Sequence, residues 1–303
     1  MRTFNRWMAL AMLVGGSAAY ADRNDFEVTK LGNPDVGEAG FNSEANANFR
    51  AFTRTFAAAL TTTNLMPPET LGHAGFSLNA ELAVVGLPPI SEVRLPTQDK
   101  QTDTLLVPSV HVRKGLPFSF ELGARMGWVD RSKMFAATGE LKWAVNEGFT
   151  WLPDVGVRLH VTRLLGNSDF DLTAAGLDVG VGKQFPLGGM VTLTPYGGMD
   201  FVGVAASTDT LDFNQGRTTG DTLGNRYVGL DDTAVYDEVR LMENVNTRFY
   251  GGVRFIGGAL QLGAEVSLTS QGSFEAVRAD TQEAFQRDLP AVLAFSTTLG
   301  LDF

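Results

Sequence analysis

Apolar and polar side chains alternate at every second position along much of this chain. Between residues 117 and 128, Leu122 and Met126 fall on one face while Glu121 and Arg125 fall on the other. Because successive side chains of a strand point to opposite faces, each such segment is predicted to be a β-strand with one apolar and one polar face. Ten segments follow this pattern, and each reaches the ~9–11 residues that a tilted transmembrane strand needs. They are residues 74–86, 103–113, 117–128, 134–146, 154–165, 168–184, 189–205, 247–256, 259–269 and 291–303.

The alternation is less regular in a few of these segments. Within 168–184 the apolar phase changes near Ala174–Gly176, which predicts a bulge or a glycine kink. Pro108 and Pro195 lie inside predicted strands, where proline is disfavoured because it cannot donate a ladder hydrogen bond. The boundaries of those two strands are therefore less sharply defined.

Charged residues lie mainly on the face opposite the apolar series. A sheet that spans a membrane must close on itself because hydrocarbon offers no hydrogen bonds to an open edge. An Arg or Lys that faces lipid at mid-membrane costs about 2–4 kcal/mol. We therefore interpret the polar face as the lining of a lumen, and we place the exception, Arg163, at a strand end. The predicted lumen-lining residues are Glu81, Arg113, Glu121, Arg125, Glu140, Lys142, Arg158, His160, Asp171, Asp178, Lys183, Asp200, Arg248, Arg254 and Glu265.

A soluble β-sandwich would explain the alternation equally well, but it would not explain the aromatic residues at the segment ends. Membrane barrels carry such aromatic girdles at both interfaces with water. The sequence therefore favours a closed antiparallel transmembrane β-barrel of ten strands, with eight or twelve as alternatives, and one amphipathic helix before it. The predicted lipid-facing girdle consists of Phe118, Trp128, Phe135, Trp143, Phe170 and Phe303.

The N-terminus has the three parts of a secretory signal peptide, which we assign to residues 1–21. Arg2 and Arg6 precede a short apolar run, and Ala19-Tyr20-Ala21 is a small-residue cleavage site. The chain contains no cysteine, so disulfides, thiolate metal sites and cysteine nucleophiles are excluded. Its net charge of −10 argues against nucleic-acid binding.

Residues 22–73 precede the predicted barrel and contain one amphipathic helix near 45–61. Phe49, Phe52 and Phe56 recur at helical spacing there, and Pro67-Pro68 ends the pattern. The helix could enter the barrel as a plug, or it could lie on the periplasmic side against the barrel base or the membrane surface. The sequence slightly favours the second position, because the three phenylalanines would need apolar partners inside a polar lumen.

The last strand ends "VLAFSTTLGLDF", with Phe295, Leu299, Leu301 and Phe303 on one face. It resembles the C-terminal sorting signal of bacterial outer-membrane β-barrel proteins, although Thr298 stands where glycine is often found. The resemblance implies insertion from the periplasm by the barrel-assembly machinery, and contact with outer-membrane lipid and lipopolysaccharide.

Connection lengths agree with this orientation. If Phe303 lies on the periplasmic side, the long connections 87–102, 206–246 and 270–290 are all extracellular, and every periplasmic connection is short. The acidic residues of 206–246 are interpreted as a solvated surface rather than a calcium site, because their spacing is not that of an EF-hand.

Three functions are compatible with this sequence. The first is passive passage of small or amphipathic solutes through a narrow charged lumen, although a ten-stranded barrel could equally be packed shut by ion pairs. The second is a non-conducting structural or surface-binding barrel that acts through its extracellular loops. The third is an outer-membrane hydrolase using His160, but no Ser/His/Asp spacing singles itself out, so we expect no enzymatic activity. We predict no cofactor and no metal.

Overall fold

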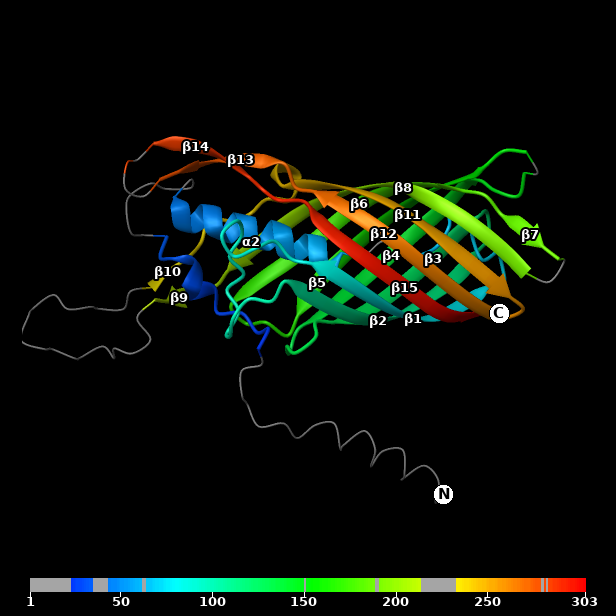
Figure 1. The fold of residues 1–303 in the computed structure, drawn as a ribbon, viewed down its shortest axis with the longest axis horizontal. Helices are drawn as coiled ribbons and strands as arrows, with labels where there is room; N and C mark the ends of the chain where they lie inside the picture. Colours follow the sequence, from blue (N-terminus) through cyan, green and yellow to red (C-terminus); the bar gives the residue numbers. More distant parts are fainter. Residues whose placement is uncertain are drawn as a thin grey trace, which may run out of the picture.

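Ten long antiparallel strands form the body of the protein (Figure 1). The structure is a computed structural model, and it describes residues 23–34, 43–61, 64–149, 151–188, 191–213, 233–278, 281 and 283–303. The predicted signal peptide, residues 1–21, lies outside the described residues. The long strands are β1 (Phe76–Gly86), β2 (Thr104–Leu116), β3 (Phe120–Trp128), β4 (Phe135–Asn146), β5 (Asp154–Leu165), β6 (Phe170–Gly182), β8 (Val191–Thr208), β11 (Val245–Gly257), β12 (Leu260–Ser270) and β15 (Val292–Asp302).

Shorter elements lie between and before these strands. They are η1 (Val28–Leu31), α2 (Glu44–Leu60), β7 (Phe185–Leu187), β9 (Leu211–Asp212), β10 (Thr233–Ala234), η3 (Leu241–Glu243), β13 (Ser273–Val277) and β14 (Ala284–Asp288). No helix within the described ranges is long and apolar enough to cross a membrane.

The sheet closes on itself. Each long strand pairs with the next along the chain, and β1 pairs with β15 through Leu78↔Leu301 and Val84↔Phe295. Closure leaves the barrel sheet without an open edge, as a membrane-spanning sheet requires. All ten predicted strands are confirmed, each with bounds within a few residues of those expected.

Apolar side chains point outward from the closed sheet. Leu122 on β3 and Leu299 on β15 are each 53% exposed, and Phe295 is 48% exposed. A soluble sandwich would bury such residues between its sheets. The outward face is therefore the surface that meets hydrocarbon.

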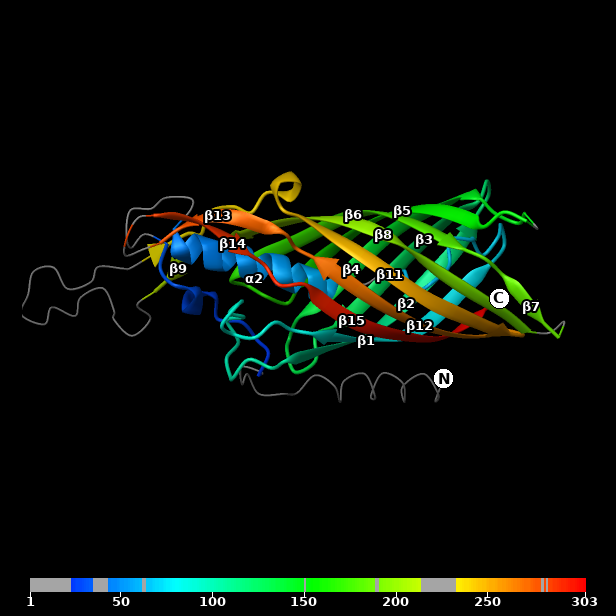
Figure 2. The same cartoon turned by 45° about the horizontal axis from the view of Figure 1, so that its top comes forward.

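The two ends of the barrel differ. Short turns join the strands at the end where Phe303 pairs with Phe76, whereas the β9–β10 and β13–β14 hairpins stand at the opposite end (Figures 1 and 2). We call these the inner end and the outer end, because outer-membrane barrels have short periplasmic turns and longer extracellular loops.

Strand β6 corrects part of the sequence interpretation. It pairs with β5 and β8 without a register shift, so the predicted bulge at Ala174–Gly176 is wrong; a register shift occurs in β4, between Ala144 and Asn146. Near residue 174 the polarity of the barrel interior changes, because the interior is apolar toward the outer end. Phe170 and Leu172 therefore point inward although they are apolar.

Two assignments made from the sequence depended on that bulge and are also wrong. Phe170 is only 3% exposed and lies inside the barrel, so it is not part of the lipid-facing girdle. Asp171 points outward and pairs with Arg163 at 3.0 Å, so it does not line the lumen. The physical reason is the same for both, since the alternation of β6 continues unbroken while the polarity of its inward face changes.

Helix α2 fills the apolar half of the interior. The Ser43 side chain accepts a hydrogen bond from the Asn46 amide and caps its N-terminus, and the helix ends at Leu60, within a residue of the predicted bounds. Phe49, Phe52 and Phe56 are fully buried. The helix lies at the outer end (Figure 2) and contacts β6, β8 and β15. The structure therefore places it inside the outer half of the barrel rather than against the periplasmic base.

An aromatic cluster joins the helix to the wall. The Phe52 ring lies 5.3 Å from the Phe170 ring and 4.9 Å from the Phe26 ring, both edge to face. Such pairs add about 0.5–1.5 kcal/mol beyond the burial of their area. The partners that the three helical phenylalanines need are thus supplied by apolar residues facing inward at the outer end.

We expect Phe52→Ala to lower the free energy of unfolding by about 3–5 kcal/mol, because it opens a cavity between the helix and the wall. The matched control is Phe285→Ala on β14, whose side chain is partly exposed, and its loss should be clearly smaller. Urea-induced unfolding of the protein in phospholipid bilayers measures both. Equal losses would contradict a packed interface between α2 and the barrel.

Candidate functional site

The inner half of the lumen contains a continuous series of ion pairs. Glu81 on β1 forms an ion pair with Arg125, with 2.7 Å between one carboxylate oxygen and Arg125 Nε, and its other oxygen lies 2.9 Å from His111 Nδ1. The second ring nitrogen of His111 lies 2.8 Å from Glu140 on β4. The imidazole ring of His111 therefore lies between the two carboxylates, with one nitrogen toward each.

The series continues around the wall from Glu140. Arg158 on β5 donates to Glu140 at 2.8 Å and to Asp178 on β6 at 2.9 Å. Tyr250 on β11 donates its hydroxyl to the other Asp178 oxygen at 2.6 Å. Because these groups are almost wholly buried, removing one partner would leave a charge uncompensated in a medium of low polarity.

A second cluster links the wall to the end of the helix. His160 Nε2 lies 3.0 Å from Asp200, and Arg248 lies 3.5 Å from the other Asp200 oxygen. Arg248 also donates to the Ala58 carbonyl at 3.2 Å and to the Thr61 hydroxyl at 2.8 Å. This arginine therefore binds the last turn of α2 to the barrel.

Residues 64–69 carry the chain on through the charged half of the lumen. Arg113 donates to the Asn64 side chain at 3.2 Å, and Arg254 forms an ion pair with Glu69. Arg254 also contacts the sulfur of Met66. The segment thus supplies hydrogen-bonding partners to inward-facing arginines, as the wall residues do.

The same segment is bound to the wall near the inner end. Lys142 pairs with Glu121 at 2.9 Å and donates to the Glu69 carbonyl at 2.9 Å. Glu121 in turn accepts a hydrogen bond from the Leu71 amide at 3.1 Å. Side chains and backbone of the segment are therefore built into the charge network of the wall.

A glutamate in the turn between β4 and β5 holds the end of this segment. Glu147 accepts hydrogen bonds from the amide and hydroxyl of Thr70, the first at 2.8 Å. Burial raises the pKa of the Glu147 carboxyl, but hydrogen bonds from Ser119 and Thr70 outweigh it, so this pKa lies below its ordinary value. Its stabilising contribution is present above the ordinary glutamate pKa and is lost as the pH falls through the lowered, folded-state pKa.

Little space remains beside the segment. The cavity between residues 64–68 and Tyr196, Tyr250 and Asp178 has a volume of about 10 Å³, which is room for about one water molecule. The described residues therefore leave little free space beside the segment at this level.

Most of the predicted lumen residues lie where the sequence placed them. Asp171 is outside, as described above, and Lys183 lies at the inner end, where it donates to the carbonyls of Phe149 and Leu152. The remaining residues are buried and face inward: Glu81, Arg113, Glu121, Arg125, Glu140, Lys142, Arg158, His160, Asp178, Asp200, Arg248, Arg254 and Glu265.

Sequence reasoning missed three buried charged residues among those that the structure describes. Glu69 and Arg54 belong to the N-terminal segment, where Arg54 donates to Asn246 on β11, and Asp154 begins β5. One signal was available, because α2 is rich in alanine and carries few charges. A helix that lacks a charged face is typically buried on all sides.

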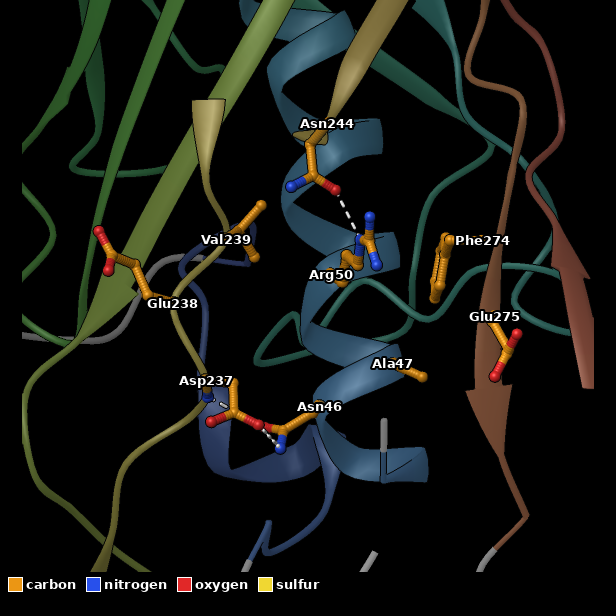
Figure 3. Close-up of a pocket in the computed structure, with 9 residues that line it drawn as sticks. All are labelled: Asn46, Ala47, Arg50, Asp237, Glu238, Val239, Asn244, Phe274 and Glu275. Atoms are coloured by element: carbon orange, nitrogen blue, oxygen red, sulfur yellow. Dashed lines mark hydrogen bonds between the residues drawn. The ribbon is translucent and has the colours of Figure 1, made fainter. Parts of the chain in front are cut away.

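A small groove opens at the outer end between α2, residues 237–244 and β13 (Figure 3). Arg50 donates to the Asn244 side chain at 2.5 Å, and its guanidinium lies 4.6 Å from the centre of the Phe274 ring. Glu238 and Glu275 stand on opposite sides of it (Figure 3). The groove is formed jointly by the helix and by extracellular connections.

The aromatic girdle follows the prediction except at Phe170. Trp128 and Phe135 are paired side by side near the outer end, while Trp143 stacks on Phe120 toward the inner end. Phe118 is 88% exposed and Phe303 is 69% exposed, both at the inner end. A closed sheet with an apolar outer face between aromatic ends is the architecture of membrane barrels.

The chain folds as a closed antiparallel β-barrel of ten long strands. No protein-family model matches it, and neither does any curated protein. Solved structures that resemble it include the attachment invasion locus protein Ail of Yersinia pestis, at 9% identity over 76% of this chain and 99% of that one, with a TM-score of 0.27. The β-domain of the Bordetella autotransporter BrkA is 14% identical over 76% of this chain and 99% of that one, with a TM-score of 0.33. Neisserial surface protein A is 10% identical over 75% and 94%, with a TM-score of 0.26.

We expect Arg158→Ala to destabilise the barrel by about 3–5 kcal/mol, because it leaves Glu140 and Asp178 buried without their shared cation. The matched control lies on the same strand: Arg163→Ala removes an ion pair on the exposed face, and such pairs are worth about 0–1 kcal/mol. Urea titration in phospholipid bilayers compares the two. Similar values for both variants would contradict a structural role of the buried series.

Proposed function

We propose that this protein is a non-conducting outer-membrane barrel that acts through its extracellular end. The observation that carries the proposal is the filling of the lumen by the chain's own residues 44–61 and 64–75. Helix α2 occupies the apolar half, and residues 64–71 are bound to the charged half through both side chains and backbone. An open conduit would instead leave the inward charges in contact with water.

The structure of the outer end supports a role in surface binding. Ala47 and Ala51 of α2 pack against Val93, Phe274 and Leu289, which belong to the connections after β1 and β12. The loops and the helix therefore share a core beyond the barrel wall. A packed surface of this kind can present side chains to a partner in fixed positions, and the groove in Figure 3 lies on it.

Passive passage of small or amphipathic solutes is the second candidate. It is favoured by the inward charges, which would line a polar path if residues 44–75 left the lumen. Passage then depends on release of that segment, and release would break the buried contacts of Arg248, Arg254 and Lys142 with it.

A hydrolase is less well supported. His160 Nε2 is engaged by Asp200, and Nδ1 has no hydrogen-bonding partner in the described part of the chain. A serine nucleophile would need to contact one of these nitrogens. We keep the expectation that the protein is not an enzyme as a prediction.

The proposed partners follow from the outward face and the outer end. We propose that the apolar belt contacts outer-membrane lipid and lipopolysaccharide. The exposed Leu299, Leu301 and Phe303 of the last strand would be read by the barrel-assembly machinery during insertion.

Planar-bilayer recording tests the proposed closure. We expect the folded wild-type protein to give no steady current above background. Phe52→Asp places a charge in the apolar half of the lumen and should produce channel openings by loosening α2. Phe285→Asp on the β13–β14 hairpin is the matched control and should stay silent. Steady conductance of the wild type would refute closure and favour passage.

A further inference from the structure

We propose that residues 23–34, which precede α2, lie at the cell surface, and that this barrel carries them across the outer membrane. The direction of the chain through the lumen carries the inference. It goes beyond the proposed function, because it does not require the lumen to be closed to ions.

The N-terminal part is fixed to extracellular connections. Asn24 donates its side-chain amide to the Asp130 carbonyl at 2.6 Å and its backbone amide to the Arg131 carbonyl at 2.9 Å. Asp25 accepts a hydrogen bond from the Lys133 amide at 2.9 Å. These partners all belong to the connection between β3 and β4, or to its edges, at the outer end.

A second extracellular connection holds the following residues. The Glu27 amide donates to the Pro96 carbonyl at 2.7 Å, and the Gln98 amide donates to the Asp25 carbonyl at 2.9 Å. Both partners lie between β1 and β2. The Phe26 ring packs at 4.6 Å on Phe56 of the helix, which ties this part of the chain to the mouth of the barrel.

The connection before β11 encloses the same residues from another side. Tyr236 donates its hydroxyl to the Val28 carbonyl at 3.1 Å and also contacts the Gly32 carbonyl. Its ring stacks on Phe49 at 4.8 Å. Residues 24–32 are thus held by three connections at the outer end.

The other end of the segment is fixed at the periplasmic side. After the contacts of Thr70 and Leu71, the Gly115 amide donates to the Gly75 carbonyl at 3.0 Å. The Phe76 amide then donates to the Phe303 carbonyl at 2.9 Å, where β1 begins. The described residues 43–61 and 64–76 therefore extend through the lumen from the outer end to the inner end.

This direction constrains assembly. A protein inserted from the periplasm has to move residues 23–34 to the outer side while Phe76 stays at the inner side. Threading them through a finished barrel would mean forcing the helix past the buried ion pairs of a filled lumen. The β1–β15 pairing closes the wall around the segment, so we infer that the segment enters before or during that closure.

The absence of cysteine allows a direct test with single-cysteine variants of the full chain. The variants are Glu27→Cys in the N-terminal part, Lys100→Cys in an extracellular connection, and His73→Cys at the inner end. The reagent is a maleimide on a polymer too large for outer-membrane pores, applied to intact cells and, separately, to permeabilised cells. Labelling is normalised to that of the denatured protein.

We expect Glu27→Cys and Lys100→Cys to be labelled in intact cells, and His73→Cys to be labelled at least tenfold less until the cells are permeabilised. Labelling of Glu27→Cys only after permeabilisation, while Lys100→Cys is labelled in intact cells, would overturn the proposal. So would labelling of His73→Cys in intact cells.

A second measurement covers the case in which position 27 is shielded by its neighbours. An epitope inserted between residues 22 and 23 should bind its antibody on intact cells, and binding only after permeabilisation would also overturn the proposal. Failure here is distinguishable from failure of the proposed function. Steady conductance of the wild type would contradict only the proposed closure of the lumen. Labelling of position 27 from the periplasmic side alone would contradict only the proposed location of residues 23–34 at the cell surface.

Discussion

The pairing of β1 with β15 is the constraint on which the rest of the structure depends. A bilayer supplies no hydrogen bonds to an open edge, so the sheet is stable in the membrane only as a closed ring. In a closed sheet the number of strands sets the width of the interior. A barrel of about eight strands is filled by its own side chains, whereas much larger barrels enclose water. Ten strands leave interior space that the wall side chains do not fill, and here residues 44–61 and 64–75 occupy it.

The filling segment matches the wall in polarity along its length. Toward the outer end the wall presents Val85, Leu105 and Phe170, and the segment presents the phenylalanines of α2. Toward the inner end the wall presents buried charges, and the segment presents backbone carbonyls, Asn64 and Glu69. The reverse arrangement, with α2 beside the charged part of the wall, would be unstable. A phenylalanine among buried charges would leave those charges without partners. The match therefore specifies both the depth and the direction of the segment.

Much of this architecture could be predicted from alternation alone. The strands, the helix and most of the charged lining follow from local periodicity, which is set by backbone geometry and is visible in a single sequence. The failures share one cause, the assumption that the inward face of a membrane barrel is polar throughout. Phe170 and Asp171 were assigned to the wrong faces because polarity was used to infer direction. The unbroken pairing of β6 shows that the direction of each side chain follows the alternation along the strand, whether that side chain is polar or apolar.

The position of α2 could not be read from the sequence for a related reason. Its phenylalanines need apolar partners, and these are far away in the sequence: Phe26 and Tyr236 lie outside the long strands, and Phe170 was assigned to the lipid-facing girdle. Only the closed sheet brings Phe26, Phe52 and Phe170 together. The scarcity of charged residues on α2 indicated that the helix is buried, but it did not indicate which part of the protein covers it.

The most direct test of the account is a proton–proton contact measured by NMR in lipid nanodiscs between the rings of Phe52 and Phe170. Their ring centroids lie 5.3 Å apart, which is within the reach of a nuclear Overhauser effect. The account predicts this cross-peak in the folded protein, with no cross-peak from the Phe52 ring to lipid chains. A Phe52 ring that contacts lipid or water and never Phe170 would contradict the claim that the chain fills its own barrel.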